Sequence, residues 1–153
     1  MRARELAEQT PMVELDTDAL VAARLMAQEQ LPGLVVRGEG KHPFIVLPGS
    51  QVLRFIIPSY VQDNPALARV FDEKAADKIA ASLAGRTVRD VLPGRQDITT
   101  VPKVNHDDTL IEVAAIMAQC HSPLVVVVNG SEVIGTITIR RLLRVLFSDE
   151  SPA

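Results

Sequence analysis

The chain has 153 residues and a mass of 16.6 kDa, the size of one ordinary domain, and can bury about two thirds of its unfolded surface. Hydrophobic residues make up 47% of the chain but aromatic residues only 3%, so the core must be aliphatic, which suits helices packed on a sheet. A net charge of −3 with so few aromatic residues argues against a nucleic-acid binder, and the single cysteine, Cys120, rules out an intrachain disulfide.

The first part of the chain alternates strand and helix patterns. Strands are predicted over residues 12–15, 34–37 and 44–47, and helices over residues 19–28 and 50–57. A glycine-rich turn over residues 38–43 separates the second and third strands, and Pro48-Gly49 precedes the second helix. The predicted order is β-α-β-β-α.

A linker helix is predicted in the middle of the chain. Asp63-Asn64-Pro65 places a capping residue before a proline in the first turn, which is typical of a helix start. The helix is expected over residues 66–83, with Gly85 ending it. Its apolar stripe would consist of Leu67, Val70, Phe71, Ile79 and Leu83.

The last part of the chain repeats the same order. A short strand is predicted over residues 98–104, and Thr109 with Glu112 has capping-box spacing before a helix over residues 110–119. An unbroken apolar strand over residues 124–128 is followed by the hairpin turn Asn129-Gly130. A strand over residues 132–139 and a helix over residues 140–147 complete the unit.

Two segments of the chain are copies of each other. An offset of 91 residues lays residues 11–36 onto residues 102–127 without a gap. The shared residues include Pro11/Pro102, Asp16/Asp107, Ala23/Ala114, Met26/Met117, Pro32/Pro123 and Val36/Val127. We therefore expect an α/β fold of the α+β type, with one repeat at 1–60, a linker helix at 61–86 and a second repeat at 87–150, together one module.

Signatures of catalysis are missing from the sequence, so we expect no enzyme activity, no required cofactor and no metal site. Gly130 and Gly135 have phosphate-loop spacing, but Thr136 stands where the lysine is needed. The histidines, His42, His106 and His121, are expected in exposed loops or at a helix end. The longest purely aliphatic stretch, residues 124–128, is too short to cross a bilayer, so we expect a cytoplasmic protein with no direct membrane insertion.

The repeat resembles the CBS domain, named after cystathionine β-synthase, and the two copies resemble a CBS tandem. The resemblance is carried by Asp107-Asp108-Thr109-Leu110, Ser122-Pro123-Leu124-Val125, Asn129-Gly130 and Ile134-Gly135-Thr136-Ile137-Thr138. It implies two repeats packed by their sheets about a pseudo-twofold axis, with clefts that bind AMP, ADP, ATP or S-adenosylmethionine. It also implies a homodimer that controls a separately encoded enzyme or transporter.

The sequence departs from the ligand motif of that family, approximately Gly-x-x-Thr-x-x-Asp. The second copy keeps Gly135 and Thr138 but has Arg141 at the Asp position, and the first copy has Gln51 there. A guanidinium cannot accept the two ribose hydroxyls, although it can bind phosphate, and a glutamine amide oxygen can still accept one hydroxyl.

The resemblance carries a set of cleft residues onto both copies. From the second copy these are Thr100, Val101, Pro123, Leu124, Thr138 and Arg141, and from the first copy Gln9, Thr10, Pro32, Gly33 and Gln51. Simple packing is the alternative for the Val, Leu and Pro members, and a helix cap is the alternative for Thr138.

Two functions follow from this set. One is a non-catalytic regulatory module that binds an adenine nucleotide or adenosyl ligand and modulates a partner. The alternative is a ligand-free interaction or dimerisation module whose clefts are degenerate, and a small enzyme of unrecognised type is a third reading. We favour the regulatory module, and the missing Asp in both copies supports the ligand-free alternative.

Overall fold

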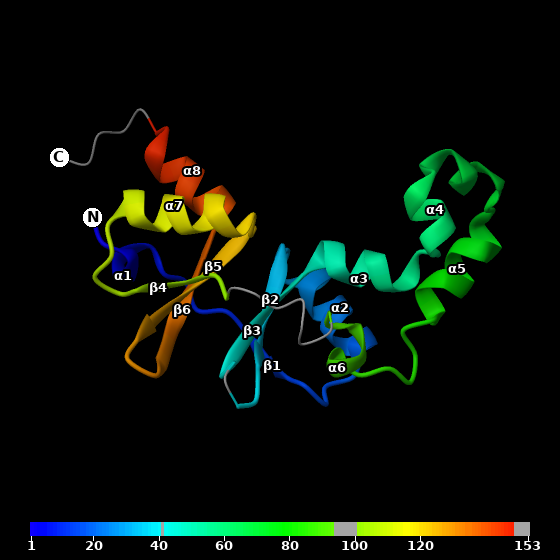
Figure 1. Cartoon of the computed structure of the whole chain (residues 1–153), viewed down its shortest axis with the longest axis horizontal. Coiled ribbons are helices and arrows are strands. Elements are labelled where there is room, and N and C mark those ends of the chain that lie inside the picture. The colour runs from blue at the N-terminus through cyan, green and yellow to red at the C-terminus, as the bar shows by residue number, and fades with distance from the viewer. Residues whose placement is uncertain (41, 94–100, 149–153) are drawn as a thin grey trace. The chain divides into compact units, whose positions relative to one another are not determined.

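A computed structural model describes residues 1–40, 42–93 and 101–148 (Figure 1). The chain forms two compact units, and one of them consists of two stretches that are separate in the sequence. Residues 12–98 form one unit, here called the first-repeat unit. Residues 1–11 and 99–153 form the other, the second-repeat unit.

The first-repeat unit contains a three-stranded mixed sheet in the order β1-β2-β3. The strand β1 (Met12–Glu14) runs parallel to β2 (Gly33–Arg37), and β2 runs antiparallel to β3 (Phe44–Pro48). Two helices accompany the sheet, α2 (Ala19–Gln28) and α3 (Gly49–Ile56). The side chain of Asp18 begins α2 by accepting the amides of Leu20 and Val21.

The second-repeat unit contains an equivalent sheet in the order β4-β5-β6. Its strands are β4 (Lys103–Asn105), β5 (Leu124–Asn129) and β6 (Glu132–Thr138). The helices α7 (Leu110–Cys120) and α8 (Ile139–Leu146) lie on one side of it (Figure 1). The predicted capping box is confirmed, because Thr109 and Glu112 satisfy each other's amides at the start of α7.

The predicted mixed α/β class with two small sheets is confirmed, and the ends of several elements move by one residue. The helices predicted from residues 50 and 140 begin at Gly49 and Ile139. The strand predicted from residue 34 begins at Gly33. This strand and the two helices therefore each start one residue earlier than the apolar pattern indicates. The strand predicted over residues 98–104 lies partly outside the described residues, and β4 covers its end.

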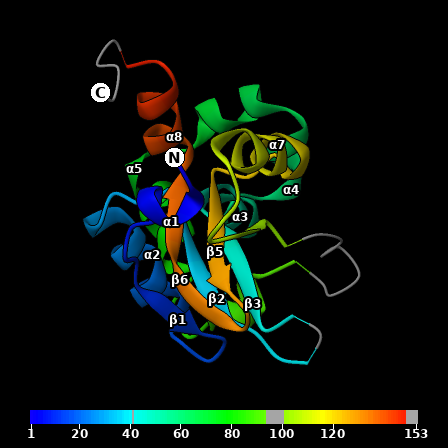
Figure 2. The ribbon, with the colours of Figure 1, turned by 90° about the vertical axis from the view of Figure 1, so that its left-hand side faces the viewer.

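Two four-residue helices, α1 (Ala3–Leu6) and α6 (Val88–Val91), exchange places between the repeats. Ala3 and Leu6 are buried in the core of the second-repeat unit, and Figure 2 shows α1 beside β6. Val88 and Val91 are buried in the core of the first-repeat unit. Each repeat's sheet is thus completed by a helix that precedes the other repeat in the chain.

Backbone hydrogen bonds dock the two short helices in matching ways. The amide of Ala3 donates to the carbonyl of Asp108 at 2.8 Å, and the amide of Val88 donates to the carbonyl of Thr17 at 2.9 Å. Asp108 and Thr17 stand at equivalent positions of the two repeats, because each lies two residues before the first residue of a long helix, α7 or α2. The boundaries of the sequence repeats therefore differ from the boundaries of the compact units, because α1 and α6 each belong to the unit of the other repeat.

The linker helix predicted over residues 66–83 is wrong as a single helix. The segment folds as α4 (Ser59–Asp63), a 3-10 helix η1 (Pro65–Val70) and α5 (Glu73–Ala81). Phe71 is extended, and the side chain of Asp72 accepts the amide of Ala75 at 2.9 Å, so a new helix begins there. Leu83 then joins the core of the first-repeat unit.

Candidate functional site

The second copy of the ligand motif lies where β6 ends and α8 begins. The Oγ1 of Thr138 accepts the amide of Arg141 at 3.2 Å, so this threonine is the N-cap of α8. The structural alternative for Thr138 is therefore confirmed. Its hydroxyl hydrogen remains able to donate to another acceptor.

Arg141 is held by the N-terminal segment. Its Nε donates to the carbonyl of Leu6 at 2.7 Å, and its guanidinium lies 3.0 Å from a carboxylate oxygen of Glu8. The Arg141 side chain is 33% exposed. Its charge is thus neutralised by the chain itself, while the side chain stays partly exposed to solvent.

Gly135 is the residue that lets the N-terminal segment approach β6. The backbones of Glu8 and Thr136 exchange two hydrogen bonds of 2.9 Å each. A Cβ on Gly135 would lie 2.5 Å from the carbonyl oxygen of Glu8, closer than real Cβ atoms come. The first position of the motif therefore needs glycine because a second backbone passes over it.

Gln9 and Thr10 also lie beside β6. The side-chain amide of Gln9 donates to the carbonyl of Ile134 at 3.0 Å, and the hydroxyls of Thr10 and Thr136 lie 3.4 Å apart. These two residues, assigned to the first copy from the sequence, belong to the second-repeat unit.

Gln51 repeats the role of Arg141 in the first-repeat unit. Its Nε2 donates to the carbonyl of Val91 at 3.0 Å. Val91 is the last residue of α6, and Leu6 is the last residue of α1. At the position where the family carries its ribose carboxylate, each copy thus has a donor that anchors the exchanged helix.

The remaining candidates surround the same strand ends in each unit. The carbonyls of Pro32 and Pro123 accept the amides of Gly49 and Ile139, each at 2.9 Å. Leu124 is paired with Thr138 across the sheet, and Gly33 with Pro48. Val101 is half-buried shortly before β4, and Thr100 lies outside the described residues. The structure groups Pro123, Leu124, Thr138 and Arg141 in one unit, and Pro32, Gly33 and Gln51 in the other.

Ion pairs on the two exchanged helices match as well. Arg4 of α1 pairs with Asp107, and Arg89 of α6 lies 3.6 Å from Asp16, the equivalent aspartate. Arg89 also donates to Glu39, and that hydrogen bond raises the pKa of the Arg89 guanidinium. Each arginine therefore ties a short helix to the repeat that the helix completes.

Sequence reasoning missed these anchoring contacts, although a signal was present. Residues 2–6 (Arg-Ala-Arg-Glu-Leu) match residues 87–91 (Thr-Val-Arg-Asp-Val) at an offset of 85, not 91. The change of offset conceals the repeat when a single shift is used. Each segment places an arginine and a carboxylate at the same positions.

The described residues contain no cluster of three or more His, Cys, Asp or Glu side chains suited to a metal ion. His121 is exposed as expected, whereas His42 and His106 are half-buried, a correction to the sequence prediction. His106 lies against Asp107, with 3.4 Å between Nδ1 and the carboxylate. In the same described ranges, no helix is both long enough and apolar enough to span a bilayer.

Comparisons with known proteins connect this geometry to a family. Residues 88–148 match the family model for the CBS domain. The crystal structure of a CBS domain-containing protein of unknown function from Kribbella flavida DSM 17836 is similar at 53% identity and a TM-score of 0.75. The match covers 97% of this chain and 99% of that chain. No curated protein is significantly similar in sequence.

Two solved structures of lower identity share the fold. CBSX2, solved in complex with AMP, is 15% identical, with a TM-score of 0.66 over 98% of this chain and 99% of that chain. The hexameric CBS-CP12 protein from bloom-forming cyanobacteria is 18% identical, with a TM-score of 0.62 over 98% of this chain and 72% of that chain.

Proposed function

Because the chain belongs to the family of CBS domain-containing proteins, we propose that it is a non-catalytic regulatory protein that binds an adenine nucleotide and modulates a partner. The tandem of repeats 1–60 and 87–150 acts as one cytoplasmic module, and the partner is a separately encoded enzyme or transporter. That a protein of this fold, CBSX2, was solved with AMP supports the ligand class.

The partly exposed side chain of Arg141 is the observation that carries the proposal. Arg141 occupies the third position of the ligand motif, and its backbone amide donates to the Thr138 hydroxyl that begins α8. A guanidinium binds phosphate by two charge-assisted hydrogen bonds, whereas it cannot accept ribose hydroxyls. The ligand is therefore a phosphate-bearing one, AMP, ADP or ATP, in preference to S-adenosylmethionine.

Binding involves an exchange of anions at Arg141. The Glu8 carboxylate occupies part of the guanidinium at 3.0 Å, and a nucleotide phosphate takes its place. The Nε hydrogen bond to Leu6 can persist, because it uses another edge of the guanidinium. Ligand binding thus loosens Glu8 while α1 stays anchored.

A second function, the ligand-free dimerisation module, is favoured by a specific observation. Arg141 and Gln51 both donate to a backbone carbonyl that ends an exchanged helix. Residues with such a structural duty need no ligand to explain their presence. In this reading both strand ends serve assembly alone.

Thermal unfolding with added ligand separates the two functions. The full chain is titrated with AMP, ADP, ATP and S-adenosylmethionine, with inorganic phosphate as a control. We expect a nucleotide at a hundredfold excess over its Kd to stabilise the fold by about 2.7 kcal/mol. Arg141→Ala should abolish this response, whereas Arg144→Ala, an exposed arginine on the same helix, should keep it. No response to any ligand at millimolar concentration would favour the dimerisation module.

A further inference from the structure

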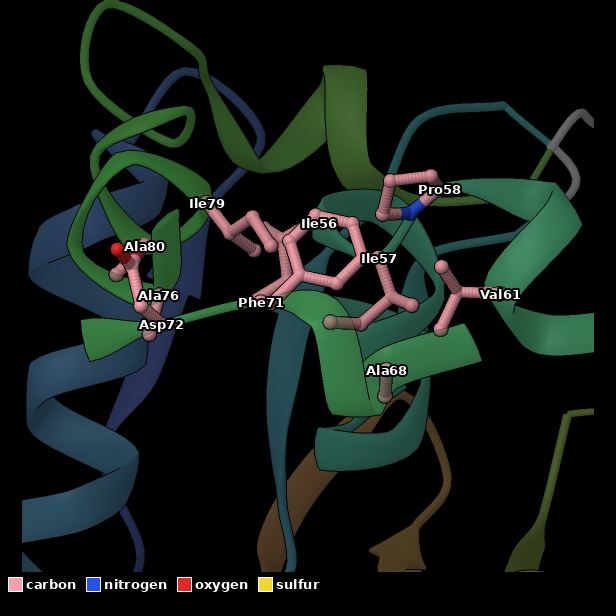
Figure 3. Close-up of a pocket in the computed structure, with 10 residues that line it drawn as sticks. All are labelled: Ile56, Ile57, Pro58, Val61, Ala68, Phe71, Asp72, Ala76, Ile79 and Ala80. Atoms are coloured by element: carbon pink, nitrogen blue, oxygen red, sulfur yellow. The ribbon is translucent and has the colours of Figure 1, made fainter. Parts of the chain in front are cut away.

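The end of α3 and the segment between the repeats line a partly open cavity of about 390 Å³ (Figure 3). It lies within the first-repeat unit and includes none of the motif residues. Its walls come from the end of α3, from α4, from η1, from Phe71 and from α5. Figure 3 shows Ile56 and Phe71 between Ile79 on one side and Val61 on the other.

The lining has the chemistry of an apolar binding site. Asp72 is the one ionisable residue among the ten that line the cavity, and its carboxylate already accepts the amide of Ala75 at the start of α5. The other nine are Ile, Val, Pro, Phe or Ala. A charged ligand would find no counter-charge there, so the cavity suits an uncharged molecule.

The helices around the cavity lack a filled core of their own. The elements α3, η1 and α5 contain no fully buried residue, and α4 contains one, Val61. Among the lining residues, Ala68, Ala76 and Ala80 are exposed. An apolar molecule in the cavity would cover these side chains, and its burial would stabilise the segment.

The volume of the cavity suits a small molecule. It falls in the range of about 300–1,000 Å³ that is usual for small-molecule sites. The cavity is partly open to solvent, so a small molecule can enter it without a rearrangement of the surrounding helices.

We propose that this cavity binds a small, uncharged aromatic or aliphatic molecule. The site is separate from Arg141 and independent of the proposed nucleotide. It is connected to the first copy's motif by α3, which carries Gln51 in its first turn and Ile56 at its end. A molecule against Ile56 therefore acts on the same helix that anchors α6 through Gln51.

A neutral fluorophore, N-phenyl-1-naphthylamine, tests the proposal on the full chain. We expect a saturable rise in fluorescence with one site per chain. Ala76→Leu, which fills the cavity from α5, should weaken binding at least tenfold. Ala81→Leu, an exposed alanine on the same helix outside the lining, should leave binding unchanged.

Several results would overturn the proposal. One is fluorescence without saturation, and another is equal affinity in wild type and Ala76→Leu. A third is a change in sedimentation coefficient of the ligand-free Ala76→Leu protein, because it would show that a second copy occupies the cavity. The nucleotide response of Ala76→Leu should equal that of wild type, so failure here is distinguishable from failure of the nucleotide proposal.

Discussion

Glu8 competes with the proposed ligand for Arg141, so its removal should strengthen nucleotide binding. Glu8→Gln keeps the size of the side chain and the backbone pairing with Thr136, and it removes the charge held 3.0 Å from the guanidinium. We expect the Kd for AMP, measured by isothermal titration calorimetry, to fall several-fold. Glu8 is 53% exposed, so losing the ion pair should cost only about 0–1 kcal/mol of stability.

The matched control for this change is Glu132→Gln, an exposed glutamate at the start of β6. It removes the same charge from the same sheet without touching Arg141. An unchanged Kd in Glu8→Gln, or an equal gain in Glu132→Gln, would contradict the anion exchange at Arg141.

Asp90 gives the first-repeat unit a defined response to acid. Its carboxylate accepts the amide of Thr87 at 2.9 Å, and this hydrogen bond lowers the pKa of Asp90 below its ordinary 3.8. A pKa that is lower in the folded chain stabilises the fold at any pH above the pKa of the unfolded chain. That stabilisation is lost as the pH falls through the pKa of the folded chain. Wild type should therefore melt above Asp90→Asn at pH 6, and the two melting temperatures should converge towards pH 3.

Asp77→Asn, on an exposed part of α5, serves as the control for general charge effects. It should track wild type across the same pH range. A difference between wild type and Asp90→Asn that does not shrink in acid would show that the hydrogen bond to Thr87 does not respond to this titration.

Single residues show how far the sequence could define the candidate site. The spacing of Gly135, Thr138 and Arg141 places them correctly at the end of one strand and the start of one helix. Their partner Leu6 lies 135 positions away from Arg141, and no periodic pattern reports such a contact. The helix-cap alternative for Thr138 was available because it depends on neighbouring residues only.

At the scale of elements, the exchange of α1 and α6 predicts that a core substitution destabilises the distant repeat. Leu6 is 1% exposed and packs in the second-repeat unit, so Leu6→Ala should cost about 2–5 kcal/mol there. Hydrogen exchange should accelerate in β5, β6 and α7. Val91→Ala is the matched change, and it should accelerate exchange in β2 and β3 instead.

The opposite pattern would contradict the exchanged positions of α1 and α6. If Leu6→Ala accelerated hydrogen exchange mainly in β1, β2 and α2, then residues 1–11 would belong with the repeat that follows them in the chain. Equal acceleration of hydrogen exchange in both units would mean that the chain unfolds as a single cooperative body. The place of α1 would then be tested by a double-mutant cycle, which measures the coupling energy between Leu6 and Val104.

Elements with strong patterns were predictable, and the short ones were not. The run Leu124–Asn129 and the capped helix Leu110–Cys120 each contain enough residues to show apolar character and a start signal. A four-residue helix such as Ala3–Leu6 spans about one turn, so it has no period to detect. In the linker, the apolar stripe suggested one helix, but Phe71 is extended and Asp72 starts a new helix.

At the scale of the whole molecule, assembly is the basis of the ligand-free module, and the family resemblance implies a homodimer for the regulatory protein as well. Helix α8 and its C-cap residue present Ile139, Leu143 and Phe147 at intervals of four residues, and their exposed fractions are 45%, 46% and 77%. Three large exposed apolar side chains on one helix face form a patch that indicates an interaction surface. We therefore expect α8 to form the contact of the homodimer that the resemblance to a CBS tandem implies.

Leu143→Asp should convert this dimer into monomers. A carboxylate in the middle of an apolar contact must be desolvated without a partner, which costs several kcal/mol and lowers the dimer population sharply. Sedimentation equilibrium measures the change in mass. Arg144→Asp places the same carboxylate on the next, exposed residue and should keep the dimer. A Leu143→Asp protein with the mass of wild type would move the interface away from α8, and a monomeric wild type would remove assembly from both functions.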